Sequence, residues 1–441
     1  MTQGIKSNEL QITNRRQGHI LTNINVWSPD SKWIVYDTRS DPAGEKFDAS
    51  TIEMVNVESR EGRDIYRSQN GAHCGVATFS TTKNCVAFIL GPEHPTSDWQ
   101  YSPWHRQGVL VEVEKPGVAV PLDARNITPP FTPGALRGGT HVHVFHPSGD
   151  LLSFTYEDHV LASRRAEPSS ADVQLSQRNV GVSVLAHPVH VPHDHPRNHD
   201  GAAFSVLATQ TVNHPRPGSD EISRACEEGW VGSSGYLRPD GSRQCLAIAF
   251  HGTVISAKGD PFVEVFLVDL PDDLTRAGDR TLEGTATTSP APPRGTQQRR
   301  LTYTENRKYP GLQGVRHWLR SSPDGSQIAF LMRDDNGVIQ IWVISPNGGE
   351  PRQVTVGDFD VASAFSWSPS GDRIAYVADN SVFTTDIASG ETVRRTERSD
   401  SSSAPRPEAC VFSPDGSRIA YVRRVASGAG DFNQIFVVTL P

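Results

Sequence analysis

Several of the sixteen histidines in this 441-residue chain stand where they could bind a metal. His141 and His143 are two residues apart in GTHVHVF, a spacing that puts both imidazoles on one face of an extended strand. His317 precedes another apolar run, in GVRHW. Because imidazole nitrogens and carboxylate oxygens suit divalent metals, we expect Mn, Fe, Ni, Zn or Ca on these three side chains. The alternative is that these histidines satisfy backbone groups between neighbouring sheets.

A histidine and an arginine form a second candidate pair. His159 ends the segment FTYEDH, and Arg178 leads into NVGVSV. Removing a proton next to a carboxylate requires a base near the carbon and a cation that neutralises the developing charge. We therefore expect His159 and Arg178 to be catalytic. In the alternative interpretation, the two side chains pair with Glu157 or Asp158 at the rim of a sheet.

Motifs of several common enzyme classes are missing from the sequence. It contains no GxSxG, no P-loop and no GxGxxG after a strand, which argues against serine hydrolase, nucleotide hydrolase and dinucleotide chemistry. The net charge of -8 disfavours nucleic-acid binding, and the five scattered cysteines indicate neither a disulfide framework nor a zinc ribbon. No stretch approaches the ~20 apolar residues of a membrane span, and the first residues lack a signal-peptide core. We therefore expect a cytoplasmic protein without a membrane segment.

The elements that position these residues repeat along the whole chain. A turn signal such as Ser-Pro-Asp-Gly separates two apolar strands in seven places, where proline presets φ and glycine reverses the chain. A third strand follows most hairpins, and a fourth ends in a polar-apolar-threonine pattern. This order predicts an all-β fold, a seven-bladed β-propeller with four-stranded blades. The seven turns lie at Pro29, Thr81, Pro147, Pro239, Pro323, Pro369 and Pro414.

The last repeat ends one strand short, at QIFVVTLP, whereas the chain begins with ELQITNRRQGH, which matches the missing strand. We therefore expect the N-terminal strand to join the last blade and close the ring, so that residues 1–441 form a single domain. The turn spacing indicates insertions near residues 162–177, 186–235 and 271–298. We expect the His/Pro-rich segment 186–201 and the Thr/Pro-rich segment 281–298 to be exposed loops.

The inner strand of each blade lines the propeller axis, and the loops that lead into these strands converge on one face. The loops between second and third strands, with His159 and Arg178, overlook the same face. Counting six residues back from each turn gives one position per blade: Asn23, Gly75, His141, Ser233, His317, Ser363 and Glu408. Beside the metal ligands, the expected substrate-binding residues are His73, Asn23, Arg316 and Glu408.

The hairpins resemble the TolB and WD40-like propeller repeats over nearly the whole chain. The segments QNGAHCGV, GTHVHVFHPSGDLLSFTYEDH and QRNVGVSV resemble a bacterial family labelled Tol biopolymer transporter-like. A more distant resemblance is to the oligogalacturonate lyases, cytoplasmic seven-bladed propellers that use a divalent metal, a histidine base and an arginine to cleave uronate oligomers by β-elimination. It implies His159 as the base, Arg178 as the arginine, and His141 or His143 with His317 as metal ligands. The fourth blade departs from this pattern because EEGWVGSSGYLRPDG contains no histidine.

Two functions are consistent with the sequence. The first is a metal-assisted, lyase-like enzyme that acts on a small acidic, uronate-containing saccharide by β-elimination. The second is a non-catalytic TolB-like propeller that binds a protein or peptide partner at the same face. Elemental analysis of the purified protein, repeated after replacement of His141 and His317, distinguishes the two.

Overall fold

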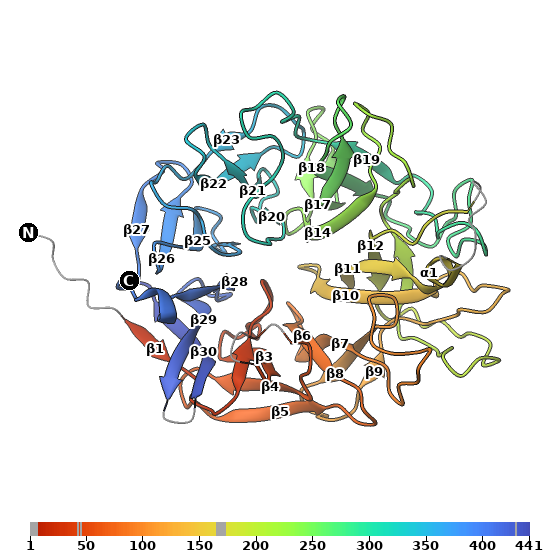
Figure 1. Cartoon of the computed structure of the whole chain (residues 1–441), viewed down its shortest axis with the longest axis horizontal. Helices are drawn as coiled ribbons and strands as arrows, with labels where there is room; N and C mark the ends of the chain where they lie inside the picture. The colour runs from red at the N-terminus through yellow and green to blue at the C-terminus, as the bar shows by residue number, and fades with distance from the viewer. Residues whose placement is uncertain (1–7, 42–43, 45, 165–172, 428–429) are drawn as a thin grey trace, which may run out of the picture.

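The computed structural model describes residues 8–41, 44, 46–164, 173–427 and 430–441. These residues form seven four-stranded antiparallel sheets arranged in a ring, which confirms the predicted seven-bladed β-propeller (Figure 1). The described residues contain one short α-helix, α1 (His159–Ser163), and one 3-10 turn, η2 (Ser401–Ser403). No helix in this part of the chain is long and apolar enough to cross a membrane.

The first three blades use consecutive strands in chain order, with the inner strand named first. Blade 1 contains β2 (Gly18–Ile20), β3 (Trp33–Arg39), β4 (Thr51–Asn56) and β5 (Gly62–Arg67). Blade 2 contains β6 (Cys74–Phe79), β7 (Cys85–Leu90), β8 (Gln107–Glu112) and β9 (Val120–Pro121). Blade 3 contains β10 (Gly138–Phe145), β11 (Leu151–Asp158), β12 (Asn179–Val184) and β13 (Phe204–Leu207).

The remaining blades follow the same order, except that the last one borrows a strand from the N-terminus. Blade 4 contains β14 (Arg224–Trp230), β17 (Leu246–Ile255), β18 (Pro261–Leu270) and β19 (Gln297–Arg300). Blade 5 contains β20 (Arg320–Ser321), β21 (Ile328–Arg333), β22 (Ile339–Ile344) and β23 (Arg352–Gln353). Blade 6 contains β24 (Ser366–Trp367), β25 (Arg373–Ala378), β26 (Ser381–Asp386) and β27 (Thr392–Arg394). Blade 7 contains β28 (Pro405–Phe412), β29 (Arg418–Ser427), β30 (Gly430–Thr439) and β1 (Glu9–Gln11).

The ring closes as predicted, because β1 pairs antiparallel with β30. Beyond β1, the Ile12 N–H donates to the Ile435 carbonyl at 2.8 Å, and the Ile12 side chain is buried between blades 7 and 1. The Glu9 carboxylate accepts a hydrogen bond from Arg423 of β29 at 2.6 Å. Closure therefore covers the strand edge that blade 7 would otherwise expose.

The Ser-Pro-Asp-Gly turns all lie on one side of the ring, which we call the turn face. In blade 7, one carboxylate oxygen of Asp415 accepts from the Ser417 N–H at 3.0 Å and from the Ser417 hydroxyl at 2.8 Å. Gly416 has φ 72°, a conformation that favours glycine. The inner strands begin on the opposite side, which we call the site face.

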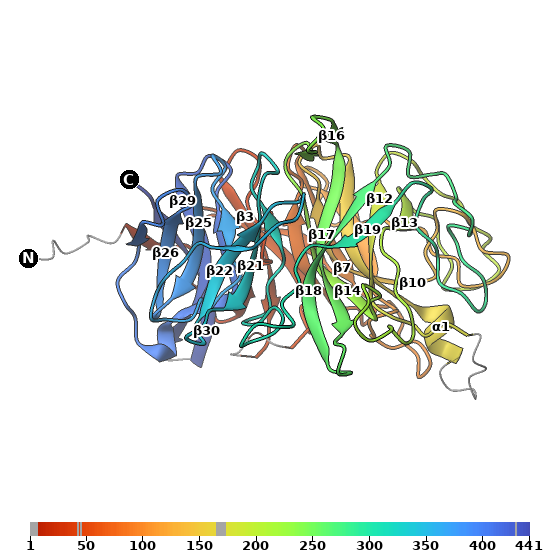
Figure 2. The ribbon, with the colours of Figure 1, turned by 90° about the horizontal axis from the view of Figure 1, so that it is seen from above.

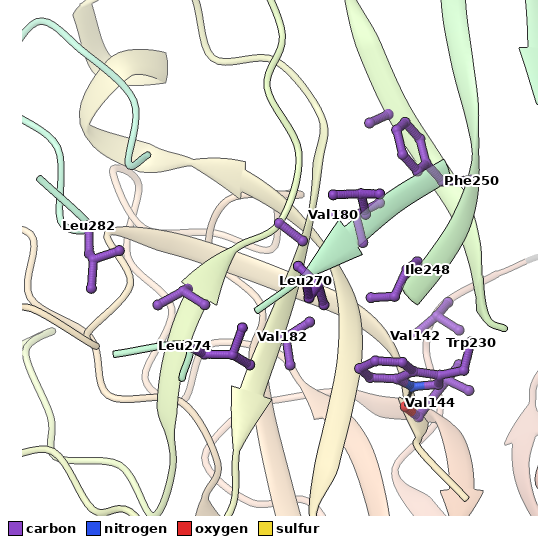
Figure 3. Packing of buried hydrophobic residues seen from close by; sticks show 14 of the residues in the cluster. Val142, Val144, Val180, Val182, Trp230, Ile248, Phe250, Leu270, Leu274 and Leu282 are labelled. Atoms are coloured by element: carbon purple, nitrogen blue, oxygen red, sulfur yellow. Dashed lines mark hydrogen bonds between the residues drawn. The ribbon is translucent and has the colours of Figure 1, made fainter. Parts of the chain in front are cut away.

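Hydrophobic side chains fill the spaces between adjacent blades. Between blades 3 and 4, Val142, Val180 and Phe250 pack in one cluster with Trp230 (Figure 3). Burial of this kind contributes about 1.5–3 kcal/mol per large side chain. The stacking of blades on one another, rather than any blade alone, therefore holds the inner strands in place.

The insertions are more tightly packed than the sequence suggested. Leu282, in the segment 281–298, belongs to the cluster between blades 3 and 4, whereas Thr281 and Thr285 are exposed, so the expected exposed loop is found only in part. Buried Arg137 fastens the same segment by donating to the Thr288 carbonyl at 3.0 Å. Residues 165–172 of the predicted insertion 162–177 lie outside the described residues.

The His/Pro-rich segment 186–201 is exposed only in part. His187, His190 and His193 are exposed as expected, whereas Asn198 is buried. The Asn198 side chain accepts from the Ile127 N–H and donates to the Pro192 carbonyl, each at 3.0 Å. The bond from Ile127 attaches this end of the segment to the rest of the propeller, and the bond to Pro192 folds the segment on itself.

Blade 4 contains a hairpin that the other blades lack. The short strands β15 (Tyr236–Leu237) and β16 (Arg243–Gln244) form a separate two-stranded sheet between β14 and β17 and stand out from the ring (Figure 2). The Pro-Asp-Gly turn at Pro239 belongs to this hairpin. Counting back from Pro239 therefore gives Ser233, which follows β14, instead of a residue at the start of the inner strand.

Candidate functional site

Three neighbouring inner strands share a bulge near their starts on the site face. Val76, Val142 and Glu227 have φ values of 61°, 54° and 52°, and the strand register shifts at each of them. A bulge of this kind redirects the side chains next to it. The residue of blade 4 that is equivalent to His141 is therefore Cys226, followed by Glu227.

His141 has an imidazole that is ready to accept a ligand or a proton. The side chain is half-buried, its Nδ1 is buried without a partner, and it makes no hydrogen bond to any residue that the structure describes. Burial, followed by the charges of Arg106, Arg316 and Arg178, holds the pKa of His141 well below its usual value. The ring is therefore neutral near pH 7 and keeps a free lone pair.

Two arginines reach this region from blades 2 and 3. Arg178 donates from Nε and Nη2 to Oε1 of Glu157 at 2.9 and 2.5 Å, and both side chains are largely buried. Arg106 is buried, and its Nε donates to the Pro103 carbonyl at 3.3 Å. Gly139 lets the loop with Arg106 approach β10, because a Cβ there would lie 2.3 Å from the Pro103 oxygen.

Two more arginines come from blade 4 and from the loop before blade 5. Arg316 donates to Glu227 at 2.9 Å while remaining about half exposed, and Arg224 donates from Nε to the Cys226 sulfur at 3.2 Å. The Arg178 carbonyl accepts from the Ala225 N–H at 2.9 Å, which joins the two halves of the cluster. The four arginines outnumber the two glutamates, so this arginine cluster carries excess positive charge and suits an acidic ligand.

A second pair of histidines lies beside Glu227. The rings of His251 and His317 are 4.8 Å apart in an edge-on arrangement. His251 has a buried Nε2 without a partner, and burial lowers its pKa to about 4. In His317, Nδ1 bonds the Val315 carbonyl at 2.9 Å and Nε2 accepts from the Leu331 N–H at 3.1 Å. His317 therefore has no free nitrogen.

The structure does not bring His141, His143 and His317 together as a metal site. His143 is buried between blades 2 and 3, with Nε2 at 3.0 Å from the Thr140 hydroxyl and 3.7 Å from Asp123. No group of three or more His, Cys, Asp or Glu residues that could hold a metal occurs among the described residues. For His317 the contacts instead match the alternative reading, in which the histidine satisfies backbone groups.

His159 and Arg178 lie in different surroundings. His159 begins α1, and its Nδ1 is 3.0 Å from Nε2 of His105. Its ring also contacts Trp99, and burial lowers its pKa to about 4. No hydrogen bond joins His159 to Arg178 or Glu157 in the part of the chain that the structure describes. Of this predicted pair, only Arg178 belongs to the arginine cluster.

The other predicted substrate-binding residues are spread around the ring. His73 is exposed, and Glu408 is paired with Arg406 at 2.6 Å. Asn23 is buried and accepts a hydrogen bond from Arg320, which reaches it from blade 5. Arg316 is the member of this set that lies in the arginine cluster.

Asn23 and Arg320 belong to a polar layer inside the channel. Glu228 is fully buried there and accepts from the Thr155 hydroxyl at 3.3 Å through Oε2, while its Oε1 has no partner. Burial, together with Glu227, raises the pKa of Glu228 to about 7, although Arg320 acts in the opposite direction.

The channel mouth on the turn face has a different character. It contains a cavity of about 320 Å³ in which Trp27, Trp230 and Trp367 take part. Each of these indoles donates to a backbone carbonyl of a neighbouring blade at 2.9–3.1 Å. The side chains suited to acid–base chemistry are therefore gathered at the opposite mouth.

A seven-bladed propeller with a cluster of arginines beside the starts of its inner strands is thus the class that fold and site define. The family model described as Protein of unknown function (DUF3748) matches residues 73–199, which include Arg106, His141 and Arg178. The model of the Dipeptidyl peptidase IV (DPP IV) N-terminal region matches residues 360–437. The chain is 49% identical over 416 residues to the "Uncharacterized protein YidR" of Escherichia coli (strain K12), covering 93% of this chain and 94% of that protein. The chain belongs to the YidR family.

Solved structures support the architecture. An oligogalacturonate lyase in complex with manganese superposes with a TM-score of 0.55 and 11% identity, covering 100% of this chain and 95% of the lyase. The oligogalacturonate lyase of Vibrio parahaemolyticus gives 0.54 and 10% identity, covering 99% and 95%. At these identities the likeness concerns the fold.

The residues that sequence reasoning missed are Arg106, Arg224, Glu227 and His251. Glu227 was missed because the turn at Pro239 belongs to the extra hairpin, so counting six residues back from it does not reach the start of the inner strand. His251 lies on the second strand, opposite Cys226, and only strand pairing brings it to the pocket. The acidic pair in ACEEGW was the one available signal, since two carboxylates in an otherwise apolar inner strand are costly to bury without a role.

Proposed function

We propose that this propeller binds a small acidic saccharide at the arginine cluster and cleaves it by β-elimination. The observation that carries the proposal is His141, a neutral imidazole with an unpaired nitrogen among arginines from three parts of the ring. An arginine can bind a carboxylate, and a neutral imidazole beside it can remove the proton from the adjacent carbon.

In this mechanism Arg178, with Arg106, binds the carboxylate of the uronate ring. Their positive charge stabilises the negative charge that develops when the neighbouring carbon loses its proton. His141 accepts that proton, a C=C bond forms next to the carboxylate, and the glycosidic C–O bond breaks. The leaving oxygen takes a proton from water and becomes a hydroxyl of the departing sugar, and the protonated His141 then releases its proton to solvent.

Substrate binding also adjusts the base. In the free protein burial, and after it the charges of the arginines, keep the pKa of His141 low, so that the ring is neutral but only weakly basic. A bound carboxylate offsets part of that positive charge and therefore raises the pKa of the imidazole towards its usual range. The base thus becomes stronger when the acidic substrate is present.

The test is to incubate the protein with a uronate disaccharide and follow the ultraviolet absorbance of the unsaturated product. We expect His141→Ala and Arg178→Gln each to lower the rate by at least ~100-fold. Arg243→Gln is the matched control, because Arg243 is exposed on the hairpin at the turn face. His159→Ala distinguishes the two candidate bases, since a loss confined to that variant would return the role of base to His159.

The competing function is a propeller that binds a protein or peptide without catalysis. Wild-type protein that forms no unsaturated product from any of a panel of uronate disaccharides would favour that function over the lyase.

A further inference from the structure

We infer that in this propeller arginine side chains supply the positive charge that holds the substrate carboxylate, and that no divalent cation takes part in binding. The inference rests on the proposed function and concerns how the same pocket works. It departs from the manganese complex of the lyase of similar fold.

The histidines that the sequence offered as ligands do not fit a cation. Both ring nitrogens of His317 are used by backbone groups, at 2.9 and 3.1 Å. A metal bound there would leave the Leu331 N–H unpaired inside blade 5, which is expensive for a buried donor. His143 lies in a closed space, because a Cβ on Gly108 would approach its Nε2 to 2.4 Å. These two side chains are part of the packing between strands.

Each of the two carboxylates has one oxygen, Oε1, bonded to an arginine. Glu157 is held by Arg178 at 2.5 Å, and Glu227 is held by Arg316 at 2.9 Å. A metal at the second oxygen of either glutamate would lie close to a guanidinium, whose positive charge repels it. His141 and His251 each keep one nitrogen without a protein partner, but the described residues do not gather them with further His, Cys, Asp or Glu side chains into a group of three or more that could hold a metal.

The arginines themselves fit the anion. A guanidinium presents several N–H donors in one plane, so it can bind a carboxylate through two parallel hydrogen bonds while keeping its own glutamate. Arg178 uses Nε and Nη2 on Glu157, which leaves further N–H groups of its fork for a ligand. The excess of arginine over glutamate repels a free cation and attracts a free acid.

The experiment is a calorimetric titration of a uronate monosaccharide, which has no glycosidic bond to cleave, into the full chain, in buffer with a chelator and in buffer with Mn²⁺. We expect the same Kd in both buffers, within about twofold. Arg178→Gln should weaken binding by about tenfold or more, whereas Arg178→Lys, which keeps the charge, should lose less. Far-ultraviolet circular dichroism of both variants checks that the propeller is intact.

A direct titration of Mn²⁺ without saccharide completes the design. We expect no saturable Mn²⁺ binding that disappears in His141→Ala. Saccharide binding that requires Mn²⁺ would overturn the inference and leave the proposed function standing. Absence of saccharide binding in both buffers would instead overturn the proposed function, and the inference with it.

Discussion

Glu228 offers a quantitative test of the polar layer inside the channel. Its carboxyl is fully buried, with Thr155 as its hydrogen-bond donor and with Glu227 and Arg320 as the charges that act on it. Burial raises its pKa in the folded protein from 4.5 to about 7. Between these two pH values the folded protein holds a proton that the unfolded chain has lost, so the free energy of unfolding falls as the pH rises. Above the folded pKa the loss is complete.

The size of the effect follows from the shift. At about 1.4 kcal/mol per pKa unit, the shift corresponds to roughly 3 kcal/mol, of which about 2–3 kcal/mol falls between pH 5 and pH 8. Glu228→Gln removes the titration while keeping an oxygen for the Thr155 hydroxyl. The free energy of unfolding of this variant should therefore decrease less between pH 5 and pH 8 than that of the wild type, by about 2–3 kcal/mol.

Urea unfolding followed by tryptophan fluorescence at the two pH values measures this difference. The comparison uses the change in the free energy of unfolding between the two pH values. A destabilisation by the buried amide that is the same at both pH values therefore cancels. Glu350→Gln is the control, because Glu350 is exposed. Identical pH dependence in Glu228→Gln and wild type would refute the reasoning.

Two further predictions concern the closure of the ring and the base. Ile12 is 4% exposed between blades 7 and 1, so Ile12→Ala should lower the free energy of unfolding by about 2–5 kcal/mol, and deletion of residues 1–14 should make the protein insoluble or strongly destabilised. Urea unfolding and solubility measurements check both, and a deletion as stable as the full chain would contradict the closure. If His141 is the base, kcat/KM should fall at low pH as His141 becomes protonated. The midpoint of this acid limb should lie below pH 6.5, because burial and the arginines lower the pKa of His141 in the free protein. Arg178→Gln should move that limb to higher pH, and an unmoved limb in a pH–rate profile would argue against His141.

The fold could be predicted from the sequence because its signal is repeated seven times. Each Ser-Pro-Asp-Gly turn is a local structure, and the Asp415 network shows that its bonds lie within a few residues. The closing strand could be predicted for a related reason, since ELQIT supplies the strand type that the last blade lacks. Local chemistry of this kind does not depend on distant parts of the chain.

The pocket could be predicted only in part, because distant contacts decide it. Glu157 and Arg178 form a pair that the sequence suggests, yet their position beside Ala225 depends on how blades 3 and 4 stack. The extra hairpin of blade 4 hid Glu227, since an inserted pair of strands leaves the turn signal intact and shifts its distance from the inner strand. His317 looked like a ligand because sequence cannot reveal that the Leu331 N–H occupies its nitrogen.

The packing of the insertion near Leu282 could not be predicted for a different reason. Threonine, proline and glycine indicate a loop, but they do not tell whether that loop lies against the body of the protein. Buried Arg137, which directly precedes β10 and bonds Asp158 at 2.6 Å and the Thr288 carbonyl at 3.0 Å, joins the segment to blade 3.

The most direct test of the central claim is a crystal structure of His141→Ala with a uronate disaccharide, in which the missing base preserves the substrate. We predict that the carboxylate of one sugar lies within hydrogen-bond distance of the Arg178 guanidinium. The C–H bond next to it should point into the space left by the imidazole. A disaccharide bound elsewhere, or one whose carboxylate faces away from Arg106 and Arg178, would contradict the account.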